Sequence, residues 1–244
     1  MAEDDPVNRI YMRNLLAKNG FSVDVARDGQ EVISILRKNR RYDAILMDVQ
    51  MPGTSGIQAT EAIRRLEKEK KIRSIPIIAV TAFGNGEERS GMFNAGVTDY
   101  ITKPIKIRDL LTVIARTLGD EAPQQQDEEN ESPHYEELLL GEFRDSEDTL
   151  AEMIRMSLLE FPKRLSKIEE AIAAEDVVVA AENSHSLANV AGILRAGELR
   201  DISIRLERLL ESRELEEARE VFPEIRRRTE SLMDTFRKLL QEKL

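Results

Sequence analysis

The sequence contains no cysteine, no tryptophan and only two histidines among its 244 residues. Without cysteine, disulfide scaffolds, thiolate zinc sites and cysteine nucleophiles are excluded, and two histidines are too few for a histidine-rich metal site. No apolar run approaches the roughly 20 residues that a membrane-spanning helix needs. Nothing at the start of the chain resembles a signal peptide, so we expect a soluble, cytoplasmic protein without a membrane segment.

Basic residues are outnumbered, because 36 Lys and Arg stand against 46 Asp and Glu, a formal charge of -10. This balance argues against non-specific nucleic-acid binding, which needs a basic surface to replace phosphate counterions. The excess acid is local: residues 1–119 sum to +4 (19 basic, 15 acidic), 120–148 to -11 (1 and 12) and 149–244 to -3 (16 and 19). Residues 120–133 also lack apolar periodicity, and we interpret them as a flexible linker between domains at 1–119 and 134–244.

The first domain alternates short β-branched runs with amphipathic segments. Strands are predicted at 21–26, 43–48, 75–81 and 97–102, and helices at 6–19, 28–39, 54–71, 85–95 and 106–118. This alternation predicts a doubly wound α/β domain with a parallel sheet and helices on both faces. In such folds the site lies at the carboxyl ends of the strands.

The second domain has helical spacing and no strand pattern. Helices are predicted at 146–174, 176–195, 197–211 and 214–243, with a short lead-in helix at 134–140. The pattern predicts an all-α, up-and-down four-helix bundle. Pro162 and Pro223 fall inside two of these helices, and we expect them to bend or interrupt the helices.

Polar side chains stand where strands of the first domain are predicted to end. Asp48, Thr81 and Lys103 follow three apolar strands, and Glu3 and Asp4 lie near the start of the chain. Converging carboxylates repel one another and suit a hard cation such as Mg²⁺, with Mn²⁺ as an alternative. A carboxylate beside such an ion can attack a phosphoryl donor and become an aspartyl phosphate, while a lysine and a hydroxyl group hold the phosphate oxygens.

These residues resemble the pattern of response regulator receiver domains, a flavodoxin-like family, over residues 1–119. The matching strings are Glu3-Asp4-Asp5-Pro6-Val7-Asn8, Leu46-Met47-Asp48-Val49-Gln50-Met51-Pro52-Gly53, Ala79-Val80-Thr81-Ala82 and Ala95-Gly96-Val97-Thr98-Asp99-Tyr100-Ile101-Thr102-Lys103-Pro104. The resemblance implies that Asp48 is the phosphoacceptor and that Thr81 and Lys103 sense the phosphate. The implied Mg²⁺ ligands are Asp4, Asp48, Glu3 through water, and the backbone carbonyl of Gln50.

The resemblance also implies a cis Lys103–Pro104 bond and a switch role for Tyr100, whose rotamer would report phosphorylation. One departure concerns the first strand, which is hydrophobic and central in receivers, whereas only Met1 and Ala2 precede Glu3 here. We therefore expect the first strand to be largely missing. Either the chain is truncated at its start, or the sheet lacks most of its middle strand, which would leave unpaired edges and weaken the positioning of Glu3.

His185 stands at the edge of the apolar stripe of helix 176–195, a position that favours exposure over burial. A solvent-facing, neutral imidazole is a nucleophile toward phosphoryl groups. The stretch 181–192, with 206–209 on the next helix, resembles the histidine phosphotransfer (HPt) domain and implies His185 as a second phosphoacceptor. Ala188 and Asn189 replace the lysine and glycine usual in that family, which puts active transfer in doubt.

The order of receiver and HPt domain resembles the C-terminus of hybrid sensor histidine kinases, of which the chain could be a fragment. We predict two-component phosphorelay signalling, in which a phosphoryl group moves between a histidine and Asp48 and to or from His185. No glycine-rich nucleotide loop occurs, so we expect no kinase domain that binds ATP. We expect His134 to be solvated and inert.

The expected partners are a sensor histidine kinase, a downstream receiver or HPt protein, or both, and the sequence does not determine the oligomeric state. The alternative function is a non-catalytic receiver and pseudo-HPt module that docks partners without phosphotransfer. Ala188, Asn189 and the short N-terminal segment favour that alternative. A DNA-binding regulator is disfavoured, because the second domain carries a charge of -3 and no recognition-helix pattern.

Overall fold

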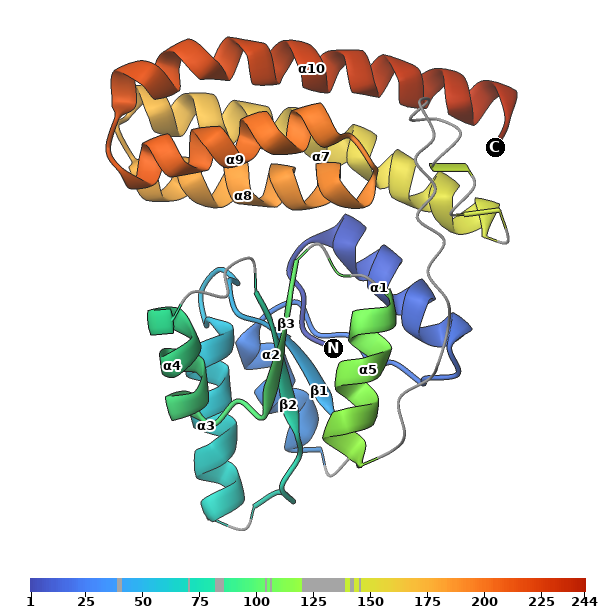
Figure 1. Ribbon diagram of the computed structural model, residues 1–244, viewed down its shortest axis with the longest axis vertical. Helices are drawn as coiled ribbons and strands as arrows, with labels where there is room; N and C mark the ends of the chain where they lie inside the picture. Colours follow the sequence, from blue (N-terminus) through green and yellow to red (C-terminus); the bar gives the residue numbers. More distant parts are fainter. Residues whose placement is uncertain are drawn as a thin grey trace. The chain divides into compact units, whose positions relative to one another are not determined.

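The structure is a computed structural model of residues 1–244, in which two compact units, Met1–Glu128 and Glu129–Leu244, are each described by themselves (Figure 1). The described residues are all except 39–40, 70, 82–85, 104, 106, 120–138, 141–142 and 145. The predicted linker at 120–133 and His134 therefore lie outside the described residues. None of the helices within the described ranges is long and apolar enough to cross a membrane.

The first unit is an α/β domain. In chain order it contains α1 (Pro6–Lys18), α2 (Gly29–Leu36), β1 (Ile45–Asp48), α3 (Gly56–Lys68), β2 (Ile77–Thr81), α4 (Gly86–Ala95), β3 (Asp99–Thr102) and α5 (Ile107–Leu118). The three strands are parallel and adjacent in the order β1-β2-β3, and helices cover both faces of the sheet (Figure 1). All residues of β1 and β2 are buried, as strands covered on both faces require. The predicted doubly wound fold is confirmed.

The predicted strand at 21–26 is wrong as a strand. Only Ala26 pairs, in an isolated parallel bridge to Ala2, although the side chains of 21–25 alternate between half-buried and exposed. A strand forms only where a neighbouring strand supplies hydrogen-bond partners, and here the neighbouring segment supplies one bridging residue, Ala2. The alternating pattern of residues 21–25 predicts which side chains face each side of a sheet. It does not predict pairing, because pairing depends on a partner from another part of the chain.

The segment Met1–Glu3 occupies the middle of the sheet. The amide of Ala2 donates to Leu46 O at 2.8 Å, and the Asp48 amide donates to Ala2 O at 3.1 Å. On the other side the Glu3 amide donates to Ala26 O at 3.1 Å. The first strand is thus reduced to one residue that bridges both neighbours, as predicted, yet Glu3 is held on the sheet by ladder hydrogen bonds.

Helix α3 begins against the end of β1. The Gly56 amide donates to Val49 O at 3.0 Å, and a Cβ atom on Gly56 would lie 2.1 Å from Asp48 O. Only glycine therefore allows this close approach of the helix to the strand end. Ser55 caps the helix in a capping box with Gln58, which places the first turn of α3 beside Asp48.

The second unit is a bundle of long helices. They are α7 (Glu147–Ala173), α8 (Val177–Ile193), α9 (Gly197–Glu211) and α10 (Leu215–Glu242). Of the predicted bending or interruption at the two prolines, interruption is wrong, because Pro162 lies within α7 and Pro223 within α10, and bending stays a prediction. Buried neighbours such as Phe161 and Leu165 anchor α7 on both sides of its proline, and this packing offsets the lost hydrogen bond. Of the predicted lead-in helix only Leu139 and Leu140 lie within the described residues, and both are helical.

Candidate functional site

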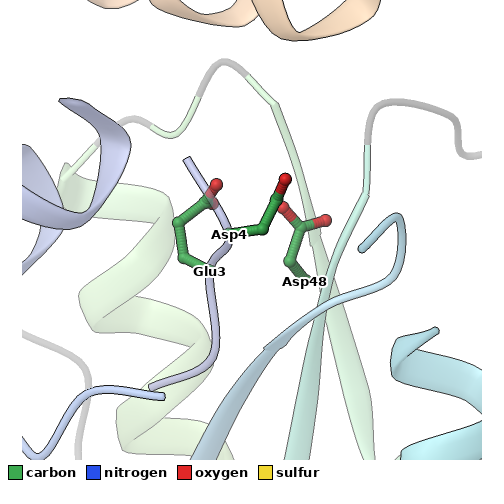
Figure 2. A group of neighbouring side chains, drawn as sticks. All are labelled: Glu3, Asp4 and Asp48. Atoms are coloured by element: carbon green, nitrogen blue, oxygen red, sulfur yellow. The ribbon is translucent and has the colours of Figure 1, made fainter. Parts of the chain in front are cut away.

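Three carboxylates meet at the carboxyl ends of the strands. Figure 2 shows the carboxyl groups of Glu3, Asp4 and Asp48 gathered beyond the end of β1. One oxygen of each carboxylate lies within 4.8 Å of the others. Lys103, which follows β3, places its Nζ atom 2.6 Å from Asp48 Oδ2 and 3.6 Å from Glu3 Oε2. The structure thus brings together four side chains that are up to 100 positions apart in the chain (103 - 3).

Backbone and side-chain donors fix the orientation of these carboxylates. Asp48 Oδ1 accepts a hydrogen bond from the Gln50 amide at 3.1 Å. Glu3 Oε1 accepts from Asn8 Nδ2 at 3.1 Å and from the Asp5 amide at 3.2 Å. Asp5 in turn caps α1, so the start of that helix and the acidic pair form one rigid corner.

The remaining predicted site residues lie near this corner or along β3. Thr81 ends β2, is buried, and accepts the Lys103 amide on its carbonyl oxygen at 2.7 Å. Gln50 is exposed next to Asp48. Tyr100 is half-buried in β3, packs edge-on against Phe93, and has the Arg89 guanidinium over its ring at 5.2 Å.

The predicted cis bond before Pro104 lies outside the described residues. The roles assigned to Thr81, Tyr100 and Gln50 stay predictions.

Burial governs the electrostatics of the cluster. It raises the pKa of Glu3 to about 8 and the pKa of Asp4 to about 6, and it raises the pKa of Asp48 as well. Burial acts in the opposite sense on Lys103, but the charges of Glu3 and Asp48 outweigh it and hold the pKa of Lys103 above its usual value. One buried ammonium group therefore faces three carboxylates, and the site has an excess of negative charge.

The donor set fits a magnesium ion. Mg²⁺ prefers oxygen ligands, usually takes one or two carboxylates, and keeps several waters. Glu3, Asp4 and Asp48 offer such oxygens, and the excess negative charge of the cluster favours a divalent cation.

A second candidate site lies between α8 and α9. His185 on α8 places Nδ1 at 2.8 Å from Glu207 Oε1 on α9. The prediction that His185 is solvent-facing is wrong, because the residue is only 9% exposed. His185 lies at the edge of the apolar stripe of α8, and it is buried because α9 packs against this edge and supplies Glu207 as a polar partner. Ala188, one turn further along α8, is buried, and Asn189 is half-buried.

Sequence reasoning assigned no role to Glu207. The residue is 4% exposed and lies on the buried face of α9 with Leu199, Leu206 and Leu210. A carboxylate among core positions of an amphipathic helix must have a polar partner, since an unpaired buried charge is very unfavourable. The position of Glu207 on that apolar stripe is the signal that could have identified it.

Comparisons with known proteins cover both units. Residues 1–115 match the family of response regulator receiver domains, and residues 152–240 match the Hpt domain family. Sensor protein GacS of Pseudomonas syringae pv. syringae is 33% identical over 219 residues, which are 85% of this chain and 24% of that protein. The polar-differentiation response regulator DivK of Brucella anthropi is 34% identical over 120 residues, 49% of this chain and 94% of that protein.

Solved receiver domains are similar in the first unit. One is the receiver domain of a sensor histidine kinase from Pseudomonas aeruginosa, solved with a magnesium ion coordinated in its active-site cleft. It is 35% identical, covers 49% of this chain and 94% of that chain, and gives a TM-score of 0.43. The chain spans about a quarter of the length of the two GacS proteins that it matches.

The raised pKa of Glu3 predicts a stability that falls with rising pH. Between the ordinary pKa of 4.5 and a folded value of about 8, the folded chain holds a proton that the unfolded chain releases. Stability is then lost at up to about 1.4 kcal/mol for each pH unit across this window. Glu3→Gln does not titrate, so without divalent metal ions its stability advantage over wild type should be larger at pH 8 than at pH 5.

Urea unfolding of both proteins, monitored by circular dichroism in EDTA, measures this difference. Glu61→Gln is the matched control, because Glu61 is exposed on α3 and its replacement should shift stability equally at both pH values. An advantage of Glu3→Gln that stays constant from pH 5 to pH 8 would contradict the raised pKa.

Proposed function

Because residues 1–115 belong to the response regulator receiver family and are followed by an Hpt domain, we propose that the chain relays a phosphoryl group between histidine and Asp48. Both domains are those of two-component phosphorelay signalling. In this proposal Asp48 is the acceptor of the first domain and His185 is the acceptor of the second. The donor to Asp48 is His185, the histidine of a separate sensor kinase, or both.

One observation supports this proposal most strongly. Lys103 Nζ lies 2.6 Å from Asp48 Oδ2 inside a cluster of carboxylates at the strand ends. A nucleophilic carboxylate needs a cation that can accept the charge of an incoming phosphoryl group, and Lys103 is already in place for this task. Gln50 restrains the other oxygen of Asp48, so Oδ2 is the oxygen that faces the cation.

A magnesium ion held by Asp4, Asp48, Glu3 through water and the Gln50 carbonyl would neutralise phosphoryl oxygens and draw the donor to the site. Glu3 and Asp4 keep their positions through the ladder bonds of the Met1–Glu3 segment and the capped start of α1. These residues therefore present their oxygens in a fixed arrangement, which lowers the reorganisation needed at the moment of transfer.

Transfer to Asp48 exchanges one bond for another. Oδ2 attacks the phosphorus atom, a P–O bond forms, and the P–N bond to the donor histidine breaks with its electron pair left on the imidazole nitrogen. The ammonium group of Lys103 then exchanges its ion pair with the Asp48 carboxylate for one with the phosphoryl oxygens. Thr81, which ends the neighbouring strand, moves inward and donates a hydrogen bond from its hydroxyl group to one of these oxygens. This movement is the event that the rotamer of Tyr100 would report.

Glu207 orients His185 for the same exchange, and the buried Nε2 atom must become accessible before a phosphoryl donor can reach it. With the Nδ1 proton shared with the Glu207 carboxylate at 2.8 Å, the imidazole keeps its lone pair on Nε2, which is then the nucleophilic nitrogen. This tautomer is inferred from the hydrogen bond. The carboxylate also stabilises the positive charge that develops on the ring as the phosphoryl group arrives, and it contributes to compensating for Ala188, which stands where the family has lysine.

We propose a sensor histidine kinase as the partner on one side of the relay and a downstream receiver or HPt protein on the other. The first partner loads the chain with phosphate and the second removes it. The matched region makes up about a quarter of the GacS proteins, so the same chemistry in a longer kinase would take place between domains of one polypeptide.

Incubation with acetyl phosphate and Mg²⁺ tests the relay. Wild type should gain an acid-stable, base-labile phosphate on Asp48 and an acid-labile phosphate on His185. Asp48→Asn should lose both labels, because the small donor reaches only the aspartate, and His185→Gln should lose the acid-labile label alone. Intact-mass spectrometry before and after acid treatment measures both, and a wild type that gains no phosphate from acetyl phosphate or from a phosphorylated histidine kinase would contradict the proposal.

Replacement of the histidine's partner gives a second test. Glu207→Gln keeps the size of the side chain but removes the charge, so transfer to His185 should slow by roughly tenfold or more while the labelling of Asp48 keeps its rate. The matched control is Glu182→Gln, an exposed carboxylate one turn before His185 on α8, which should transfer at the wild-type rate. Equal rates for Glu207→Gln and wild type, in rapid-quench assays, would show that Glu207 has no part in the chemistry.

A further inference from the structure

The first turns of α1 fold back onto the two acidic residues that precede the helix, Glu3 and Asp4. Arg9 Nη1 donates a hydrogen bond to Glu3 O at 3.0 Å and another to Asp4 O. The Asp5 side chain accepts the Asn8 amide at 3.0 Å and so caps the helix. The backbone of the two acidic residues is thus held by α1, and the orientation of the Glu3 side chain remains to be fixed.

Asn8 contributes to that orientation. Its Nδ2 atom donates to Glu3 Oε1 at 3.1 Å, and the Asp5 amide donates to the same oxygen at 3.2 Å. An ionised carboxylate only accepts hydrogen bonds, so the nitrogen of the Asn8 carboxamide is the atom assigned to face Glu3. Because Oε1 is engaged twice, Glu3 Oε2 is the oxygen that faces Lys103 Nζ, at 3.6 Å, inside the carboxylate cluster.

The oxygen of the Asn8 carboxamide lacks a partner. Asn8 is 3% exposed, and its Oδ1 atom is buried without a hydrogen bond to any residue in the part of the chain that the structure describes. A buried acceptor in this state is unfavourable, and it indicates an ordered water or an ion at its side. Oδ1 and Nδ2 are bonded to the same carbon atom, so this acceptor lies next to Glu3 at the edge of the cluster.

The hydration shell of a magnesium ion contains the donor that Oδ1 lacks. Mg²⁺ keeps several waters when it binds to carboxylates, and each of these waters has two protons with which to donate hydrogen bonds. In the proposed site Glu3 accepts one hydrogen bond from such a water. The second proton of that water then needs an acceptor, and Asn8 Oδ1 is a buried acceptor beside Glu3.

We propose that Asn8 is a positioning residue for hydrated Mg²⁺: Nδ2 orients Glu3, and Oδ1 accepts a hydrogen bond from the water that Glu3 also holds. The inference rests on the proposed function, because it uses the magnesium site of Glu3, Asp4 and Asp48. Asn8 acts through Glu3 and through the water, and it contacts neither the ion nor the phosphoryl group.

This arrangement predicts selectivity for Mg²⁺ over Ca²⁺. Mg²⁺ demands near-ideal octahedral geometry and gives up its waters reluctantly, so a fixed position for one of its waters favours it. Ca²⁺ accepts more ligands in a flexible geometry and depends less on any one water. Loss of Asn8 should therefore weaken the binding of Mg²⁺ more than the binding of Ca²⁺, whereas a general loosening of the fold would weaken both alike.

The test replaces Asn8 by leucine, which has nearly the same shape and no polar atom. Asn8→Leu should raise the Kd for Mg²⁺ by about tenfold or more, and the Kd for Ca²⁺ by less than about threefold. Titration of the full chain with each metal chloride, at constant pH and ionic strength, measures both constants through the Gln50 amide signal in two-dimensional NMR spectra. In wild type the carbon-13 signal of the Asn8 carboxamide should also shift as Mg²⁺ is added.

Asn19→Leu is the matched control on the same helix. Asn19 is the exposed C-cap of α1, and its Nδ2 atom donates to Leu15 O at 2.8 Å. Both Kd values of this variant should equal those of wild type. If Asn8→Leu does not fold, as judged by circular dichroism, Asn8→Ala takes its place, because alanine is the best helix former. Its Kd for Mg²⁺ should rise several-fold and by more than its Kd for Ca²⁺.

The proposal is overturned if Asn8→Leu keeps the wild-type Kd for Mg²⁺, because Oδ1 would then be bonded only by an ordinary buried water. It is also overturned if the Kd values for Mg²⁺ and Ca²⁺ rise by the same factor, because Asn8 would then only support the fold. Both results leave the relay intact, since the labelling of Asp48 in wild type is measured separately. A wild type that binds no Mg²⁺ would overturn this inference together with the proposed magnesium site.

Discussion

The first unit is organised around the buried carboxylates of Glu3 and Asp48, the half-buried carboxylate of Asp4 and the ammonium group of Lys103, all at the ends of its strands. Charged groups removed from water are stable only beside groups of opposite charge. Lys103, which lies between Asp48 and Glu3, provides the electrostatic attraction that offsets the cost of burying these carboxylates. The compensation is incomplete, as the raised pKa values of Glu3 and Asp4 show. That incompleteness favours a divalent cation, which would in turn offset the negative charge of an incoming phosphoryl group.

The fold supplies the rest of the restraint through backbone contacts. Gly56 lets α3 start against the end of β1, and the Gln50 amide fixes one oxygen of Asp48. Glu3 depends on the short ladder of the Met1–Glu3 segment. The second unit uses the same principle in a simpler form, because a buried carboxylate, Glu207, orients the nitrogen of His185. In both units a buried partner prepares the proposed acceptor.

The sequence predicts the fold class and the carboxylate cluster well, because both follow from local patterns. Apolar runs such as Ile77–Thr81 identify buried parallel strands, and polar residues that follow such runs must meet at one edge of the sheet. Features that depend on a distant partner escaped prediction. Residues 21–26 alternate like a strand but pair only at Ala26, and His185 is buried because Glu207 comes from another helix. Pro162 breaks a local rule that packing in α7 overrides.

Three carboxylates share one ammonium group in the cluster, so it lacks positive charge until a divalent cation binds. A carbon-13 NMR titration of the Glu3 carboxyl group, with and without Mg²⁺, tests this charge balance most directly. Without metal the midpoint should lie near pH 8, since burial raises the pKa of Glu3 to about 8, and saturating Mg²⁺ should lower that midpoint by more than one pH unit. A midpoint near the ordinary pKa of 4.5 in both conditions would contradict the account.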